Sequence, residues 1–314
     1  MRYIQERRLF LLISSLLLVT LLLLVYVRYA RVKGEKLAAE VAAPEDQHLP
    51  HVTVTFLDIG QGDASYIIFP SGEDMLIDCA KDGRILVALG RVMTPFDRTI
   101  DYLIVTHPDN DHYGGCIDVL KRFRVNHIVY NGLRKNQEPY WRYFWDMVES
   151  EDAVYHEIGG RETWELASST FSFLYPDHPV TADMSVPGSV EEPIDNNTSI
   201  VAKLTFGAES VLFTGDTERA LEEYLVGAAK GELDSDVLKV GHHGSPGSSS
   251  QAFVDAVSPR YASISVGKEN TYGHPSQRVI RRLERSGADI WRTDESGDIE
   301  MRLYKDAIFL HNNR

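Results

Sequence analysis

The stretch "VTHPDNDHYGG", residues 105–115, follows an apolar run and places two histidines and two aspartates within six residues. The run before it, "IDYLIVTH" at residues 100–107, is typical of a β-strand buried on both faces, so His107 marks the carboxyl end of a strand. In a tight loop, side chains at i, i+2, i+4 and i+5 converge on two adjacent points, and imidazole with carboxylate suits Zn²⁺, Mn²⁺ or Fe²⁺. The stretch therefore predicts a metal site; the alternative is a polar turn in which Asp109 or Asp111 caps the next helix.

Two distant stretches have the same character. The apolar run "SVLF" is followed by "TGD", which places Asp216 at the carboxyl end of another strand, with a helix N-cap as the alternative role. In "LKVGHHGS", His242 and His243 are adjacent on a glycine-flanked turn, and core packing does not explain such a pair. Functional groups concentrate in loops at strand ends, so all three stretches are candidates for chemistry.

The strand pattern predicts the fold class. Period-two alternation begins at residue 51, in "HVTVTFLDIG", and short strands follow in "ASYIIF" and "DMLIDC". Helical stretches such as "RILVALGRVM" and the aromatic "PYWRYFWDMV", which indicates core packing, are interspersed with further strands. Two comparable halves of this kind predict an α/β (α+β) fold in which two mixed sheets face each other with helices outside. No linker interrupts residues 51–312, so this span is predicted to be one domain.

The N-terminus carries a separate signal. Residues 9–27, "LFLLISSLLLVTLLLLVYV", form a run of 19 residues without a charge. At 1.5 Å per residue the run spans roughly 28 Å, close to the ~30 Å hydrocarbon core of a bilayer. A cleaved signal peptide has a shorter apolar run and a small-residue cleavage site directly after it, whereas Arg28, Arg31 and Lys33 follow here. The sequence predicts a short tail at residues 1–8, one transmembrane signal-anchor at residues 9–27 and a linker at residues 28–50.

The short tail favours an N-terminus inside the cell, although basic residues flank the span almost equally on both sides. We therefore expect a single-pass membrane protein whose large domain is extracytoplasmic. The two cysteines, Cys79 and Cys116, do not make a disulfide framework, and both lie beside apolar residues. They could pair in an exported domain, but buried free thiols are favoured.

The formal net charge of −14 is unevenly distributed. Residues 1–36 hold seven Lys/Arg and two Asp/Glu, a net of +5, so the remainder carries 25 basic against 44 acidic residues, a net of −19. Such a domain does not attract nucleic acid by its overall field. One local exception, which we call the arginine stripe, follows "YGHPS" at helical spacing i, i+3, i+4 and i+7 and consists of Arg278, Arg281, Arg282 and Arg285. The stripe suits phosphodiester backbones; the alternative is a solvated face paired with acids such as Glu284.

The motif "HPDNDHYGG" resembles the metal-binding signature of the metallo-β-lactamase superfamily. Together with "DIGQGDA", "NNTSIV", "FTGD", "LKVGHHGS" and "YGHPS" it is similar to the metallo-hydrolase domain of ComEC-type competence DNA-uptake proteins, from about residue 51 to residue 303. The resemblance implies a four-layer αββα metallo-β-lactamase sandwich, preceded here by one transmembrane helix, with the metal cleft at one edge of the paired sheets. No dinucleotide cofactor is expected.

The resemblance also implies one or two divalent metal ions, Zn or Mn. The implied ligands are His107, Asp109, Asp111, His112, Asp216 as the bridge, and His242, with His243 as the rival of His242. The usual superfamily pattern is His-x-His-x-Asp-His, and Asp109 stands at the second histidine, which hardens the site toward Mn²⁺ or Mg²⁺. The superfamily also places a histidine before the bridging aspartate, where Asn196 or Asn197 stands here. One tight and one loose metal is therefore an alternative to two equal ones.

The implied chemistry is metal-assisted hydrolysis. Asp111 or Asp216 would orient a water or take its proton, and His274 or His243 would stabilise the developing charge. The resemblance further implies that Asp63 shapes the cleft, and we expect substrate contacts from Asn197 and the arginine stripe.

Three functions compete. The first is a membrane-tethered phosphodiesterase or nuclease that acts on DNA, in particular single-stranded DNA, or on another phosphodiester. The second is a small-molecule ester, lactone or cyclic-nucleotide hydrolase, because one fold hosts many reactions. The third is a non-catalytic metal-dependent binding domain, which the weak ligation near Asn196 would favour.

Overall fold

The computed structural model describes residues 49–135, 137–181, 186–189 and 194–311. The chain divides into two units, residues 1–49 and 50–314, and only the second is described below. The predicted tail and signal-anchor, and the linker up to residue 48, lie outside the described residues. Within the described ranges, no helix combines the length and the apolar character needed to cross a bilayer.

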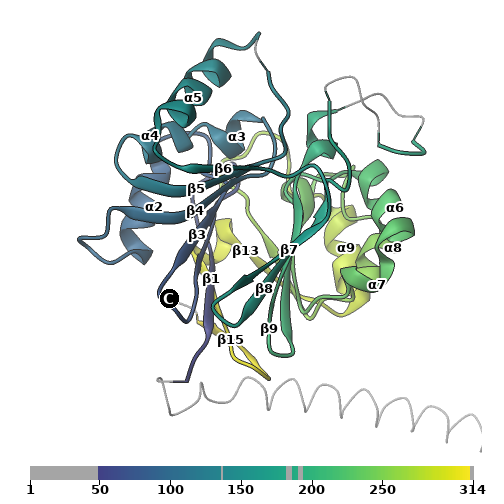
Figure 1. The fold of residues 1–314 in the computed structure, drawn as a ribbon. Helices are drawn as coiled ribbons and strands as arrows, with labels where there is room; N and C mark the ends of the chain where they lie inside the picture. Colours follow the sequence, from purple (N-terminus) through teal and green to yellow (C-terminus); the bar gives the residue numbers. More distant parts are fainter. Residues whose placement is uncertain (1–48, 136, 182–185, 190–193, 312–314) are drawn as a thin grey trace, which may run out of the picture. The chain divides into compact units, whose positions relative to one another are not determined.

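Two β-sheets form the centre of the second unit (Figure 1). The first sheet has the order β15-β14-β1-β2-β3-β4-β5-β6 and the second has the order β13-β12-β11-β10-β9-β8-β7. The strands of the first sheet are β1 Val52–Phe56, β2 Ser65–Ile68, β3 Asp74–Ile77, β4 Thr99–Val105, β5 Arg124–Tyr130, β6 Val154–Glu157, β14 Ile299–Leu303 and β15 Ile308–His311. The strands of the second are β7 Glu162–Leu166, β8 Ser169–Tyr175, β9 Val201–Phe206, β10 Glu209–Phe213, β11 Val237–Lys239, β12 Tyr261–Ile264 and β13 Asp289–Arg292.

Helices cover the outer faces of both sheets (Figure 1). On the first sheet lie α2 Arg84–Val92, α4 Cys116–Leu120 and α5 Pro139–Ser150. On the second lie α6 Arg219–Ala228, α7 Lys230–Leu233, α8 Gln251–Val257 and α9 Gln277–Ser286. The shorter elements are α3 Asn110–Tyr113, α10 Thr293–Ser296 and the 3₁₀ turns η1 Asp195–Thr198 and η2 Gly241–Gly244.

The apolar residues of the strands account for this layering. Side chains from the inner faces of both sheets form one buried cluster, in which the rings of Phe56 on β1 and Phe213 on β10 lie 6.2 Å apart between centroids. Separate clusters lie between each sheet and its helices, and Trp141, Phe144 and Trp145 of α5 are buried in one of them. The predicted αββα arrangement and the packing role of the aromatic helix are confirmed.

Strand direction brings loop ends together. Strands β1, β2 and β3 are antiparallel, as the predicted meander requires, whereas β3 to β6 run parallel. In the second sheet β10 to β13 are also parallel. Parallel strands end at the same edge of a sheet, and open α/β sheets bind ligands beyond those carboxyl ends. The stretches that the sequence analysis predicts to bind metal follow β4, β10 and β11 at such ends.

The C-terminal hairpin returns to the first sheet. Strand β14 pairs with β1 in antiparallel register, Phe56 opposite Ile299, and β15 pairs with β14 at the edge. As a result the first strand of the domain lies inside a sheet, between β14 and β2.

A disulfide joins Cys79 and Cys116, and the expectation of buried free thiols is wrong. The backbone N–H of Cys79 donates to the carbonyl of His112 at 2.7 Å, so the end of β3 lies against the loop before α4. This contact holds the two cysteine Cα atoms 5.1 Å apart, within the range that a disulfide spans. Their separation of 37 residues hid the proximity.

Candidate metal centre

The three stretches meet at one place. Nε2 of His112 lies 3.2 Å from Oδ2 of Asp216. Nε2 of His243 lies 3.4 Å from Oδ2 of Asp111 and 3.6 Å from Oδ2 of Asp216. The ring of His107 is 4.1 Å from that of His112 between centroids. Residues that follow β4, β10 and β11 therefore surround one small volume.

Four groups of three side chains within the described residues could hold a metal ion, with ligand atoms no more than 4.8 Å apart. The groups are His107, His112 and Asp216; Asp111, His112 and His243; Asp63, Asp78 and His112; and Asp63, Asp216 and His243. Because His112 belongs to three groups and Asp216 to two, the groups overlap, and we treat them as one candidate centre.

The centre has the unpaired atoms that a cation would satisfy. Nε2 of His107, His112 and His243 and Oδ1 of Asp216 are buried and have no hydrogen-bond partner in the described parts of the chain. The ion-pair distances above are short, but they do not have hydrogen-bond geometry. Each unpaired buried polar atom costs about 1–3 kcal/mol, a cost that divalent cations held by the groups above would offset. The side chains present thus fit a divalent metal.

Asp78 determines which nitrogen of His112 faces the centre. Oδ2 of Asp78 lies 2.8 Å from Nδ1 of His112 and also accepts the hydroxyl hydrogen of Thr106 at 2.8 Å. A carboxylate only accepts, so Nδ1 carries the proton and Nε2 is left to offer a lone pair. A carboxylate behind an imidazole is the arrangement that orients metal-binding histidines.

The other two imidazoles are oriented in the same way. The hydroxyl of Thr106 gives its hydrogen to Asp78 and so accepts from Nδ1 of His107, 3.0 Å away. Nδ1 of His243 donates to the carbonyl of Ser265 at 2.9 Å. All three Nε2 atoms are therefore the ones available to a cation.

The opposite charges of the histidines and aspartates at the centre shift one another's pKa values. Burial lowers the pKa of His243, but the charges of Asp216 and Asp63 raise it to about 10. Burial raises the pKa of Asp216, but the charges of His112 and His243 hold it well below its usual range. Protonated imidazoles thus neutralise the carboxylates, and a cation that replaces those protons is expected to release them.

His242 lies beside the candidate groups and belongs to none of them. Its Nδ1 is 2.7 Å from Oε1 of Glu218 and 3.1 Å from Nδ2 of Asn196, while its Nε2 is 3.8 Å from Oδ2 of Asp216. The side chain of His242 is 26% exposed, against 1% for His243. Both residues have positive φ, 46° and 52°, which gives the adjacent rings different surroundings. The geometry favours His243, the rival in the sequence analysis, as the ligand.

Asp109 also lies outside the four groups. Its Oδ2 is 3.6 Å from Nε2 of His107, and its Oδ1 is 3.1 Å from Nζ of Lys135. Burial raises the pKa of Asp109, but His107 and Lys135 hold it below its usual range. Lys135 is paired with Asp195 as well. The carboxylate at the second-histidine position is therefore engaged by an ammonium group.

The loop that carries Asp63 packs directly on the loop that carries Asp111. The N–H of Asp63 donates to the carbonyl of Asp111 at 3.2 Å. At Gly62, with φ of +120°, an added Cβ would lie 2.4 Å from that same oxygen, so only glycine fits. Asp63 forms a buried ion pair with Lys239 of β11, whose Nζ also donates to the carbonyl of Gly215 at 3.3 Å.

Sequence reasoning missed Asp78, Thr106 and Lys239. Asp78 follows β3 just as Asp216 follows β10, so its place at a strand end was a usable signal. Lys239 and Thr106 gave none, because a lysine inside a strand and a threonine beside a histidine are ordinary.

The remaining predicted residues lie around the centre. The ring of His274 is 5.7 Å from that of His242 between centroids. Oδ1 of Asn197 accepts the N–H of Glu218 at 3.0 Å, so this asparagine supports the loop after Asp216. In the arginine stripe on α9, Arg282 donates to the carbonyls of Ser248 and Ser249 at 3.0 Å, Arg285 bonds Gln251, and Arg278 and Arg281 are exposed.

Comparisons with known proteins identify relatives of this chain. The chain is 31% identical over 274 residues to ComE operon protein 3 of Bacillus subtilis (strain 168) and 32% identical over 276 residues to competence protein ComA of Neisseria gonorrhoeae. These alignments cover 81% and 85% of this chain but 33% and 34% of those proteins, so the chain spans about a third of their length. The resemblance to competence proteins is confirmed.

The fold has a solved counterpart in CmlA, a diiron β-hydroxylase from Streptomyces venezuelae, with a TM-score of 0.50 and 15% identity over 81% of this chain and 54% of that one. At this identity the match shows the fold alone. Residues 57–268 match the metallo-beta-lactamase superfamily. The sandwich, the convergent histidines and this match together show that the chain belongs to the metallo-β-lactamase superfamily.

Proposed function

We propose that this protein is a metal-dependent phosphodiesterase or nuclease that acts on DNA, in particular single-stranded DNA. The observation that carries the proposal is the set of buried, unpaired Nε2 atoms of His107, His112 and His243 around the carboxylates of Asp111 and Asp216. Such a donor set suits Zn²⁺ or Mn²⁺. A bound divalent ion would lower the pKa of a water and polarise a phosphoryl oxygen.

The protein side chains around the centre supply the remaining groups. Asp111 is 31% exposed, so it can reach a water and a substrate that the buried carboxylates cannot. Burial raises the pKa of Asp111, but His243 and His112 beside it lower the pKa below its usual value, so the carboxylate is ionised and can orient a water or accept its proton. Asp216 is buried, with Oδ2 3.2 Å from Nε2 of His112 and 3.6 Å from Nε2 of His243.

His274 suits contact with a leaving group or a phosphoryl oxygen. Its ring lies beside the candidate centre, 5.7 Å from that of His242 between centroids. Burial, together with the charges of His242 and His243, lowers the pKa of His274, so the ring is neutral at pH 7 and offers one N–H.

The arginine stripe supports a polyanionic substrate. Helix α9 begins directly after His274 and Pro275, and the N–H of Ser276 donates to the carbonyl of Gly244 in the histidine turn at 2.8 Å. Burial lowers the pKa of Arg282, and the nearby charges of Arg219 and Arg278 lower it further. Guanidinium groups that repel one another in this way are neutralised by a phosphodiester backbone.

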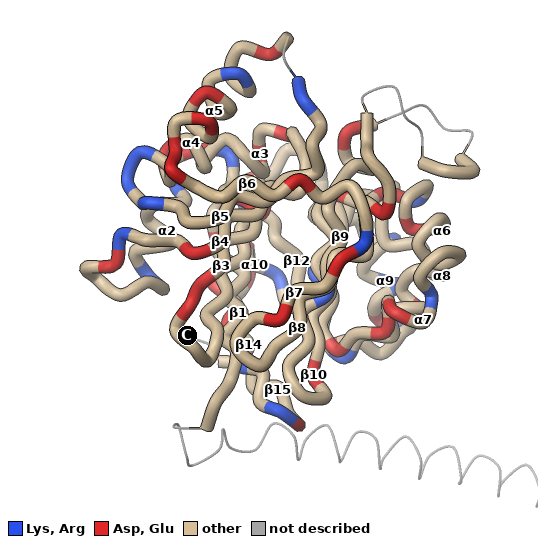
Figure 2. The backbone as a smooth tube through the Cα atoms, in the orientation of Figure 1, with Lys and Arg blue, Asp and Glu red and all other residues tan. Residues whose placement is uncertain are grey.

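Figure 2 shows basic segments scattered among acidic ones, so attraction to DNA has to be local rather than a property of the whole domain. The resemblance to competence proteins supports DNA over other phosphodiesters.

We also propose that the chain is a single-pass membrane protein with an extracytoplasmic domain. The uncharged run at residues 9–27 supports the anchor. The Cys79–Cys116 disulfide supports the location, because disulfides persist in oxidising compartments.

The test uses the purified full-length chain with Mn²⁺ or Zn²⁺ and end-labelled single-stranded DNA. We expect cleavage by the wild type and by Asp146→Asn, an exposed control in α5, and none by His112→Ala or Asp216→Ala. Turnover of a nitrophenyl phosphodiester without DNA cleavage would redirect the assignment to a small-molecule hydrolase. Bound metal without turnover of either substrate would indicate a binding domain.

A further inference from the structure

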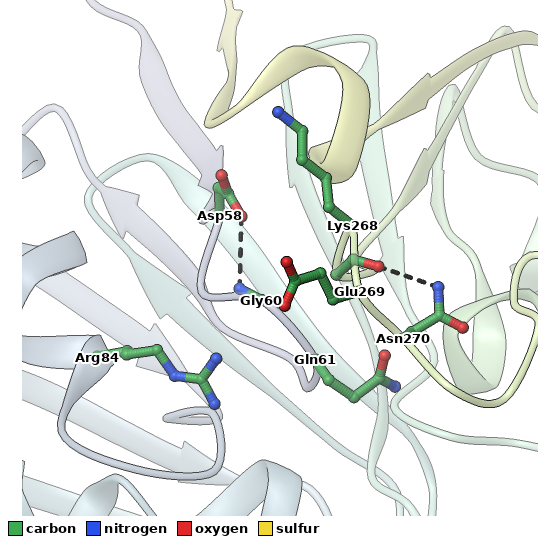
Figure 3. A pocket seen from close by; sticks show the side chains of 8 residues that line it. Asp58, Gly60, Gln61, Arg84, Lys268, Glu269 and Asn270 are labelled. Atoms are coloured by element: carbon green, nitrogen blue, oxygen red, sulfur yellow. Dashed lines mark hydrogen bonds between the residues drawn. The ribbon is translucent and has the colours of Figure 1, made fainter.

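A pocket of about 370 Å³ lies outside the four candidate metal groups (Figure 3). It is lined by Asp58, Gly60, Gln61, Arg84, Gly267, Lys268, Glu269 and Asn270. Its volume is within the range of about 300–1,000 Å³ that small-molecule sites occupy. Neither the metal centre nor the arginine stripe uses any of these residues.

Both walls of the pocket continue into the metal centre. The loop with Gln61 runs on to Asp63, whose N–H donates to the carbonyl of Asp111 at 3.2 Å. The opposite wall begins two residues after Ser265, whose carbonyl accepts from Nδ1 of His243. An added Cβ at Gly267 would lie 2.8 Å from the backbone nitrogen of Gln61, so the two loops touch. Both loops that line the pocket therefore also contribute contacts to the centre, through Asp63 and Ser265.

The charges that line the pocket balance. Arg84 and Lys268 are offset by Asp58 and Glu269, and Arg84 is also engaged by Asp82 through two hydrogen bonds of 2.9 and 3.0 Å. A phosphate site requires an excess of positive charge, which this lining lacks. The pocket suits an uncharged polar group.

One side chain of the lining has unused hydrogen-bonding capacity. Oε1 of Gln61 is buried and has no partner in the described parts of the chain. Asn270, by contrast, is fully used, since its amide donates to the carbonyls of Gly267 and His274 and accepts the N–H of His274, each at 2.9 Å. Asn270 thus fixes the wall. The Gln61 amide, whose Oε1 is enclosed by protein atoms, would turn into the pocket to pair with a planar ring that presents a donor beside an acceptor, as the edges of nucleobases do.

We infer that this pocket binds a nucleobase of the substrate, next to the phosphodiester at the metal centre, and that Gln61 contacts the edge of the base. The inference rests on the proposed function, because the base belongs to the nucleic acid that the centre would cleave. It makes the protein sensitive to the presence of a base at one position beside the scissile bond.

The test compares single-stranded oligonucleotides that carry one abasic site at successive positions with the intact oligonucleotide, using the full-length chain. For the wild type, one abasic position is expected to lower kcat/KM about tenfold, in the range that a lost pair of base-edge hydrogen bonds gives. Gln61→Ala should lower kcat/KM on the intact oligonucleotide by a similar factor and lose the abasic effect, and Gln61→Glu should do the same. Gln137→Ala, an exposed glutamine outside the pocket, should behave as wild type. Turnover of bis(4-nitrophenyl) phosphate, which has no base, should be unchanged in all of them.

Equilibrium binding of the same oligonucleotides in the presence of a chelator gives a second measurement, independent of hydrolysis. Weaker binding of the abasic oligonucleotide by the wild type, but not by Gln61→Ala, supports the pocket even if the protein cleaves nothing and the proposed function fails. If Gln61→Ala and the wild type respond equally to every abasic position in both assays, the inference is overturned, whether or not DNA is cleaved.

Discussion

Replacing Asp78 by asparagine should weaken metal binding although it leaves in place the side chains that carry the proposed function, His107, His112, His243, Asp111 and Asp216. The carboxylate holds Nδ1 of His112 at 2.8 Å and accepts both the N–H and the hydroxyl of Thr106, which in turn contacts Nδ1 of His107. Oδ2 of Asp78 contacts both the His112 imidazole and the Thr106 hydroxyl, and Oδ1 accepts the Thr106 N–H. In Asp78→Asn the amide donor therefore faces either the first two groups or the Thr106 N–H, and at least one contact on Asp78 is lost. The backbone is undisturbed, because Asp78 has φ of 59° and asparagine adopts this region as readily.

The magnitude follows from the bond that is lost. A hydrogen bond to a charged group contributes about 1.5–3 kcal/mol, and outer partners of metal-binding histidines affect metal affinity about 10- to 100-fold. These two ranges agree, since each tenfold change corresponds to about 1.4 kcal/mol. We expect the Kd for Zn²⁺ to rise by one to two powers of ten, to about 10–100 times the wild-type value.

The assay is competition for Zn²⁺ between the full-length protein and a chromophoric chelator. His112→Ala, which removes a proposed ligand, sets the upper limit of the effect, and Asp146→Asn on the surface of α5 sets the lower limit. An Asp78→Asn variant that binds Zn²⁺ as tightly as Asp146→Asn would refute the role of the carboxylate. Unfolding curves of both variants in the presence of chelator separate a change in affinity from a change in stability.

Three further predictions concern other parts of the domain. Burial raises the pKa of Glu222 from 4.5 to about 7, so the folded state holds a proton that the unfolded chain releases. The free energy of unfolding should therefore fall by up to about 3 kcal/mol between pH 4.5 and 7. Urea unfolding of Glu222→Gln should not show this fall, and equal pH dependence of wild type and variant would contradict the prediction. Replacing Cys79 and Cys116 by serine should cost about 2–4 kcal/mol of unfolding free energy, and the reduced wild type should match the variant in urea. The double variant Arg278→Ala, Arg281→Ala should bind single-stranded DNA more weakly, and the slope of log K against log salt concentration should be smaller by about 0.7 per arginine. Titrations at several salt concentrations measure this slope, and an alanine variant of an exposed arginine in α5 is the control.

Local patterns were sufficient to predict the fold. The alternation after residue 51 and the apolar run before His107 each lie within one short stretch of sequence, so they predict the strands and the layers without knowledge of distant contacts. His107 and Asp216 were predicted as site residues because each follows the end of a strand, β4 and β10. These predictions need only the direction of a strand and the tendency of polar groups to gather where it stops.

The details of the site depend on contacts between distant residues. Asp78 and His112 are 34 residues apart and meet only because β3 and β4 are neighbours. His242 and His243 are adjacent, and which of them enters the candidate centre is decided by positive φ angles at both positions, which the two histidine letters do not encode. The Cys79–Cys116 pair was hidden for the same reason.

The position of β14 has a consequence for how the chain is made. Strand β1 is synthesised before the other strands of the domain, yet its partner on one side, β14, begins only at Ile299. Until β14 is synthesised, β1 has an open edge, and open edges invite pairing with other chains. The first sheet can therefore be completed only after β14 has been synthesised, and a chain truncated before β14 should aggregate.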